Sequence, residues 1–243
     1  MLVANWKMNG SSAKVNKWIE FVDSSIPEQI QSTCVFCPPT CFLYQASHSI
    51  KERDLKISLG AQDIDPISKT GLTGGISGFM LKELGCKYVI IGHSERRMNY
   101  KEGNSLLTKK LLAAASEDLK IIFCIGESLQ EKESGKTYYS LKKQLEVISK
   151  VENAKLIIAY EPVWAIGSNN PAELEYIEEV HNGISEELKS LEINEPLGIM
   201  YGGSVKMDSS KQILSLNNVD GLLIGGASLN EAEFSNIALS SSA

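Results

Sequence analysis

The sequence has no block of basic residues, and it contains no apolar run approaching the roughly 20 residues that a bilayer requires. Its 24 lysines and arginines are outnumbered by 30 aspartates and glutamates, which gives a formal net charge of -6. An acidic chain without a basic tail is unsuited to nucleic acid or anionic membranes, so we expect neither as a partner. The N-terminus also lacks a targeting pattern, and we therefore expect a soluble, cytoplasmic protein.

The sequence has only five cysteines, an odd number: Cys34, Cys37, Cys41, Cys86 and Cys124. A sizeable chain without a secretory signal is expected to keep such thiols reduced. Cys34 and Cys37 do have the spacing of a redox or metal motif. No second pair or nearby histidine completes a site, however, so buried structural thiols are the favoured interpretation.

No linker rich in proline, glycine or serine divides the 243 residues, which favours one domain over residues 1–243 rather than two small ones. Short apolar runs recur instead, and their unbroken apolarity suits parallel strands buried on both faces. The expected strands are Leu2–Asn5, Cys34–Cys37, Ile57–Gln62, Tyr88–Gly92, Ile121–Ile125, Leu156–Tyr160, Leu197–Tyr201 and Gly221–Ile224.

The segments between these strands are long enough for crossover helices, and Gly103–Ser116 and Tyr138–Ser149 show helical periodicity. Eight such units in about 250 residues predict an α/β fold, a (β/α)8 barrel. An open, doubly wound sheet is the alternative.

Polar residues gather where the expected strands end. These residues are Asn5, Lys7, Gln62, His93, Glu127, Glu161 and the pairs Gly202-Gly203 and Gly225-Gly226. The carboxyl ends of barrel strands meet at one rim, so the barrel predicts that these side chains share one site.

The two glycine pairs follow the last two expected strands. A Gly-Gly pair is often only a tight turn, but here both pairs fall where such barrels bind phosphate through backbone N–H groups. Lys7 lies just beyond the first strand, where a lysine is ordinarily a solvated charge. Beside a phosphate site it would neutralise the anion and polarise a carbonyl.

His93 and Glu161 are the candidate acid–base pair. His93 ends a strand beside a helix start, and the helix dipole there disfavours imidazolium, so a neutral ring could donate a hydrogen bond to a substrate oxygen. A half-buried histidine satisfied by backbone is the alternative. Glu161 precedes Pro162, and in a dry pocket its raised proton affinity would suit a general base. A rim salt bridge with a lysine is the other interpretation of Glu161.

Several longer motifs carry a resemblance to a known family. They are "ANWKMNG" at 4–10, "GHSERR" at 92–97, "CIGE" at 124–127, "AYEPVWAIG" at 159–167, "YGGSV" at 201–205 and "GGASL" at 225–229. In order and spacing this set is similar to that of the triosephosphate isomerases, over the whole chain. The resemblance implies a single-domain TIM barrel that interconverts dihydroxyacetone phosphate and D-glyceraldehyde 3-phosphate in glycolysis and gluconeogenesis, without a metal or organic cofactor.

The resemblance also implies residue roles. Glu161 would be the base that moves the proton between C1 and C2, His93 the neutral electrophile, and Lys7 the cation that stabilises the enediolate, while Asn5 adds a polar contact. The groups implied to hold phosphate are the backbone N–H groups of Gly167, Ser204, Gly225 and Gly226. Glu95 and Cys124 would support the site from behind, and Glu127 would be structural.

Two departures from the family pattern stand out. The expected lid, Pro162–Asn170, ends in Ser168-Asn169-Asn170 where the family usually has Thr-Gly-Lys, which predicts altered loop kinetics. In "KTGLTGGIS" (69–77), Gly75 replaces an acid that in the family pairs with an arginine of a neighbouring subunit, here Arg96. Because Thr73 and Gln62 are retained, we still expect a homodimer.

Two other functions remain open at the level of the sequence. Another phosphosugar isomerase or an aldolase on the same barrel would also need a phosphate site, but not Lys7, His93 and Glu161 in this order. A non-catalytic phosphate-binding protein would keep the binding residues without the chemistry.

Overall fold

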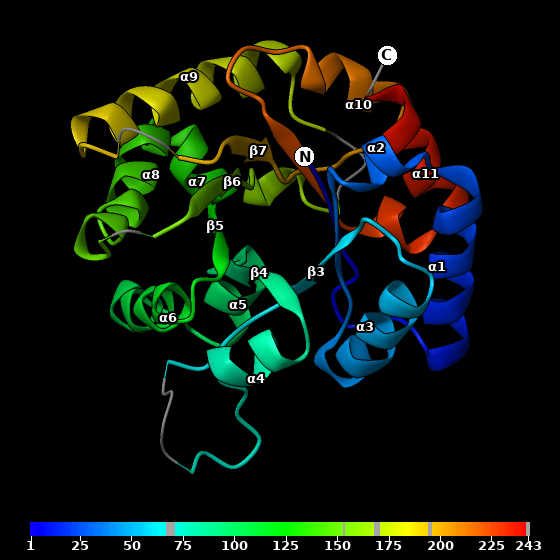
Figure 1. Cartoon of the computed structure of the whole chain (residues 1–243). Helices are drawn as coiled ribbons and strands as arrows, with labels where there is room; N and C mark the ends of the chain where they lie inside the picture. The colour runs from blue at the N-terminus through cyan, green and yellow to red at the C-terminus, as the bar shows by residue number, and fades with distance from the viewer. Residues whose placement is uncertain (67–70, 153, 168–170, 194–195, 242–243) are drawn as a thin grey trace.

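The computed structural model describes residues 1–66, 71–152, 154–167, 171–193 and 196–241. Eight parallel strands close into a barrel in sequence order, because β1 pairs with both β2 and β8. Helices surround the strands (Figure 1). The closed barrel confirms the (β/α)8 prediction and rules out the open sheet.

The observed strands lie close to their predicted positions. They are β1 (Leu2–Asn5), β2 (Cys34–Cys37), β3 (Ser58–Ala61), β4 (Cys86–Ile91), β5 (Lys120–Ile125), β6 (Leu156–Tyr160), β7 (Ile199–Tyr201) and β8 (Gly221–Ile224). β7 is shorter than predicted, because Gly198 adopts φ 145° and the Leu197 side chain is 49% exposed.

Eleven α-helices are present in the described part of the chain. They are α1 (Ser12–Ser25), α2 (Glu28–Gln31), α3 (Leu43–Glu52), α4 (Gly78–Glu83), α5 (Ser94–Asn99), α6 (Asn104–Ser116), α7 (Leu129–Glu133), α8 (Thr137–Leu145), α9 (Leu174–Ser190), α10 (Met207–Leu214) and α11 (Glu231–Ser240). The helix predicted over Tyr138–Ser149 ends early, at Leu145, and a 3₁₀ turn follows at Ile148–Lys150. There Val147 and Ile148 are buried against the core, which draws the chain out of the helix.

The strands are apolar on both faces because each face has its own core. Val3, Ile90, Ile122 and Met200 belong to the smaller cluster, which fills the barrel, whereas their neighbours along the strands pack under the helices. Alternate residues of one strand therefore serve different cores, and this explains the unbroken apolar runs of the sequence.

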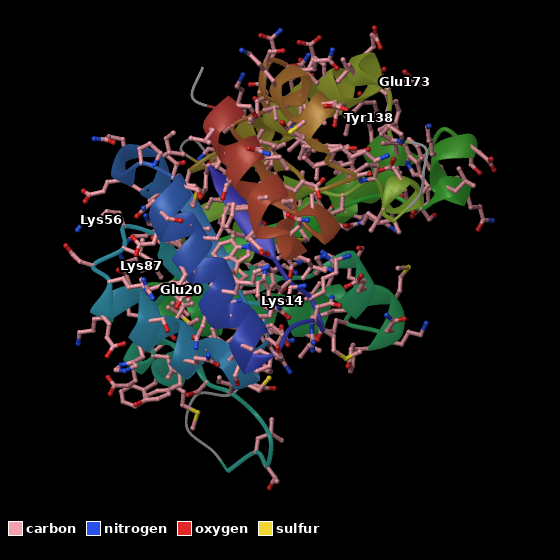
Figure 2. The ribbon with its side chains drawn as sticks, turned by 90° about the vertical axis from the view of Figure 1, so that its right-hand side faces the viewer. Lys14, Glu20, Lys56, Lys87, Tyr138 and Glu173 are labelled. Carbon is pink, nitrogen blue, oxygen red and sulfur yellow. The ribbon has the colours of Figure 1, made fainter. Side chains whose placement is uncertain are left out.

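Helix α1 illustrates the sequence pattern of a helix that packs against the barrel. Ser11 caps its N-terminus by accepting a hydrogen bond from Lys14 N, and Val15, Trp18, Ile19 and Val22 form its buried face at helical spacing. Its outer face carries charged side chains such as Glu20 (Figure 2).

The cysteines bear out the structural interpretation. All five are free, and Cys34 and Cys37 are both buried in β2. Burial raises the pKa of Cys34 to about 11, so this thiol stays protonated near neutral pH.

Candidate active site

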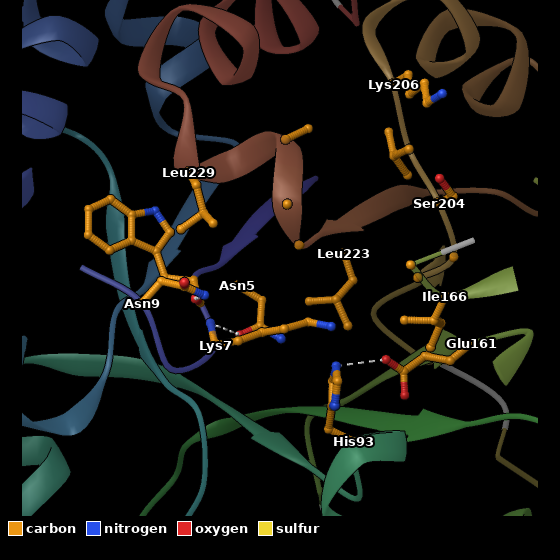
Figure 3. A pocket seen from close by; sticks show the side chains of 18 of the residues that line it. Asn5, Lys7, Asn9, His93, Glu161, Ile166, Ser204, Lys206, Leu223 and Leu229 are labelled. Carbon is orange, nitrogen blue, oxygen red and sulfur yellow. Dashed lines mark hydrogen bonds and ion pairs between the residues drawn. The ribbon is translucent and has the colours of Figure 1, made fainter. Parts of the chain in front are cut away.

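A pocket of about 430 Å³ opens at the carboxyl ends of the strands (Figure 3). Its walls come from the loops after β1, β4, β6, β7 and β8. Every residue predicted to contact substrate lines it: Asn5, Lys7, His93, Glu161, Gly167, Ser204, Gly225 and Gly226. The barrel thus brings together groups up to 221 positions apart, as the strand-end pattern predicts (Asn5 to Gly226).

Lys7 is held in place through both its backbone and its side chain. Its φ of 52° is in the left-handed region, and Asn5 Oδ1 accepts from Lys7 N at 3.1 Å while Gln62 Nε2 donates to Lys7 O at 3.0 Å. These bonds compensate a backbone strain of about 1 kcal/mol. Lys7 Nζ lies 2.7 Å from Glu95 Oε1, so the ammonium group is paired yet reaches the pocket.

Glu161 follows β6 directly and is 1% exposed. Its Oε1 lies 2.9 Å from His93 Nε2, and its Oε2 accepts from Ser94 N at 2.8 Å (Figure 3). Burial raises the pKa of Glu161, but His93 and these hydrogen bonds lower it more, so the net pKa is below its ordinary value. No described lysine forms a salt bridge with Glu161, so the lysine-pairing alternative does not hold there.

His93 precedes α5 and accepts a long hydrogen bond from Glu95 N at Nδ1, 3.3 Å away. That contact assigns the proton to Nε2, which faces Glu161. Burial lowers the pKa of His93, but the Glu161 carboxylate raises it more, and the net pKa lies above its ordinary value. The Glu161 carboxylate thus stabilises the charged form of the ring, and its departure from Nε2 would strengthen the preference for the expected neutral form.

Gly225 and Gly226 form an open seat beside Lys7, whereas Gly202 and Gly203 pack closely against Glu161 and Tyr201. Gly225 lies so close to Lys7 that a Cβ there would be 3.3 Å from Lys7 Cε, whereas a Cβ on Gly226 would meet nothing within 4 Å. The indole N–H groups of Trp6 and Trp18 both donate to Ser228 O, which ties this seat to the first βα unit. Backbone N–H groups at such a seat suit a phosphate group.

A family model for triosephosphate isomerase matches residues 1–241. The chain belongs to the triosephosphate isomerase family. It is 42% identical to the triosephosphate isomerase of Dictyoglomus thermophilum over 99% of this chain and 98% of the relative. The triosephosphate isomerase of Polynucleobacter asymbioticus is 37% identical over 96% of both chains.

Family membership confirms the resemblance found in the motifs and the enzyme class that it implies, an isomerase. The expected reaction, the interconversion of dihydroxyacetone phosphate and glyceraldehyde 3-phosphate, is confirmed with it. Two further observations concern the described residues. No group of three or more His, Cys, Asp or Glu in the described residues could hold a metal ion. No helix among them is long and apolar enough to cross a membrane.

The residues predicted to support the site, Glu95, Cys124 and Glu127, do not line the pocket. Cys124 is fully buried, and burial followed by the charge of Glu161 raises the pKa of its thiol well above the usual range. Glu127 points away from the pocket, where its Oε1 accepts from Tyr160, Trp164 and Tyr176 at 3.1, 2.8 and 3.0 Å. Glu127 thus ties the segment after Glu161 to α9.

Sequence reasoning did not single out Ser94, which contacts Glu161, or several residues that line the pocket, among them Lys206 and Glu233. Ser94 was missed although it adjoins His93 in the "GHSERR" motif, because its role is played by a backbone N–H. Lys206 and Glu233 line the pocket, but both belong to helical starts where charged residues are common. Of the expected lid, Pro162–Gly167 is described and Ser168–Asn170 lie outside the described residues.

Arg96 has acidic partners within its own chain. Its Nη2 lies 2.7 Å from Asp63 Oδ2 and 2.8 Å from Glu102 Oε1. Gly75 indeed offers no acid, and the described part of its loop, between β3 and α4, stands away from the barrel (Figure 1). The arginine that was expected to lose a partner in a neighbouring subunit is therefore paired locally.

Proposed function

We propose that this isomerase works through an enediolate, with Glu161 as the base that moves the proton between C1 and C2. The observation that carries the proposal is that Glu161, His93 and Lys7 line one pocket together with the glycine seat. A phosphate group on the seat would place the rest of a three-carbon substrate between the ammonium group and the carboxylate. Gly167, Ser204, Gly225 and Gly226 would then hold the phosphate, and Asn5 would orient Lys7.

The Glu161–His93 contact supports the division of roles. A substrate oxygen that takes over His93 Nε2 displaces Glu161 Oε1 and frees the carboxylate. Without the carboxylate beside it, burial lowers the pKa of His93 and favours the neutral electrophile. Once Glu161 is separated from His93, its burial raises the pKa of the carboxyl group. A general base that works near neutral pH requires such a raised proton affinity.

Lys7 and its surroundings account for charge stabilisation. The ammonium group lies beside Gly225 in the pocket, where it would stabilise both the phosphate and the oxyanion of the enediolate. Glu95 keeps Lys7 in position at 2.7 Å, and Cys124 keeps the wall behind Glu161 apolar. Neither needs to touch substrate.

The test is a coupled assay of glyceraldehyde 3-phosphate conversion on the protein and on Glu161→Asp, which retracts the carboxylate by one methylene. We expect kcat to fall by about 10²- to 10⁴-fold, because proton transfer depends steeply on position. Glu133→Gln, an exposed glutamate of α7, is the control and should keep full activity. Activity of Glu161→Asp within tenfold of the parent would rule Glu161 out as the base.

We further infer one domain over residues 1–243 that assembles as a homodimer in the cytoplasm. All eight strands belong to one barrel. Large apolar residues are exposed in the first four βα units, among them Met8, Tyr44, Phe79 and Tyr100, at 96%, 73%, 59% and 70% exposure. A second copy of the chain would cover them. Free cysteines fit a reducing compartment.

A further inference from the structure

Some charged side chains around the pocket have an oppositely charged partner among the described residues, and others do not. Lys7 is bound to Glu95 at 2.7 Å, and Glu161 to His93 at 2.9 Å. Lys206 also lines the pocket, yet among the described residues no acid lies within ion-pair distance of its ammonium group. Lys206 is therefore the lysine of the pocket wall whose charge is not already neutralised by a described partner.

Lys206 occupies the phosphate end of the pocket. It follows Ser204 by two residues on the loop after β7 and precedes α10, and Figure 3 shows it beyond Ser204 at the pocket rim. The N-terminus of α10 adds a partial positive charge at the same place. Glu233 from α11 lines the same wall and opposes an incoming anion. The local field there therefore depends on Lys206.

A phosphate ester carries about -1.5 to -2 charge at pH 7 and must approach a protein with a net charge of -6. An unpaired cation at the mouth of a cleft raises the local concentration of such an anion and its association rate. We propose that Lys206 is a guiding residue that draws the phosphate group of the triose phosphate onto the seat at Ser204, Gly225 and Gly226. This inference rests on the proposed placement of phosphate.

The exposure of Lys206 determines how it acts. The side chain is exposed, so salt screens its field over about 8 Å at physiological ionic strength. Its contribution therefore appears in substrate capture, kcat/KM, and disappears at high salt. The chemical step, which depends on Glu161 and His93, does not change.

The experiment compares charge changes at Lys206 with the same changes at Lys211, an exposed lysine of α10 that does not line the pocket. At about 10 mM ionic strength we expect kcat/KM to fall about threefold in Lys206→Gln and about tenfold in Lys206→Glu. Lys206→Arg should retain the parent value. At about 0.5 M salt all variants should agree within twofold, with kcat constant throughout.

Equal losses at positions 206 and 211 would overturn the inference in favour of a general charge effect. A loss in kcat, a loss that persists at high salt, or no loss at all would also overturn it. The affinity for inorganic phosphate, measured by calorimetry on the same variants, is a second test that does not depend on catalytic activity. Weaker binding in Lys206→Glu than in Lys211→Glu supports the inference even if Glu161→Asp proves the proposed base wrong.

Discussion

Burial sets the protonation state of His181, a single side chain outside the pocket. The ring is fully buried on α9, and its Nδ1 lies 2.7 Å from Asn218 O. Burial lowers its pKa to about 4, while the exposed ring of an unfolded chain titrates near 6.5. The unfolded state therefore binds more protons between these values, so stability is lost as pH falls through this window.

We expect this residue to lower the free energy of unfolding by about 2 kcal/mol between pH 7.5 and pH 5. Urea unfolding at the two pH values and a fixed protein concentration measures the change. His181→Phe keeps a ring against Tyr160 and Tyr201 but cannot titrate, so its pH dependence should be smaller by that amount. An unchanged pH dependence in His181→Phe would show that other groups cause the effect.

The positions of the candidate site residues could be predicted from the sequence, but the contacts between their side chains could not. Lys7, His93 and Glu161 each end an apolar run, and the barrel brings strand ends together regardless of their separation. The contact between Lys7 and Glu95 joins residues 88 positions apart, and its existence depends on how the loop after β1 packs against α5. The contact between Glu161 and His93 likewise depends on tertiary packing, so the sequence did not predict the raised pKa of the ring.

At the scale of elements, a charge network joins the end of β3 to α5 and α6. Lys110, whose side chain is 2% exposed, lies 2.7 Å from both Asp63 Oδ1 and Glu102 Oε1, and Arg96 contacts the same two acids. The two positive charges of this network therefore neutralise its two negative charges. Removing one acid leaves an uncompensated charge, which is costly where water is excluded.

Asp63→Asn is therefore expected to lower the free energy of unfolding by about 2 kcal/mol, less than for a fully buried pair because Asp63 is 21% exposed. Chemical denaturation at pH 7 measures the loss. Asp54→Asn removes an acid whose side chain is 92% exposed beside Lys56 and should change stability by less than about 0.5 kcal/mol. Equal effects of the two variants would mean that the network is not stabilising.

Element boundaries followed from the sequence where a strong local signal exists. Helix α6 begins at Asn104 and ends at Ser116, within one residue of the prediction, because its apolar face is continuous. The error in the segment after α8 has a tertiary origin. Val147 and Ile148 fit a helical pattern and are buried in the core, but the chain reaches the core there through a 3₁₀ turn rather than a continued helix. Periodicity shows that such residues are buried without showing which way the chain must turn.

At the scale of the whole molecule, the proposed dimer would support the pocket loops. Met8 directly follows Lys7, and its side chain is 96% exposed in the isolated chain. Phe79 on α4 is 59% exposed, and α3, α4 and α5 lie along the same side of the ring (Figure 1). A partner that covers these side chains would also restrain the loop that carries Lys7. The proposed dimer would thereby couple activity to assembly.

Sedimentation at micromolar concentration should therefore give twice the 26.6 kDa chain mass. Phe79→Glu places a charge in the proposed interface, so we expect a shift toward monomer together with a lower kcat/KM as the Lys7 loop loses support. Tyr139→Glu on α8 changes a side chain of similar exposure, 58%, on a different part of the ring and should remain dimeric and active. A parent protein that sediments as a monomer at these concentrations would refute the dimer. A monomeric Phe79→Glu variant with full activity would instead show that the barrel alone holds Lys7 in place through Asn5, Gln62 and Glu95.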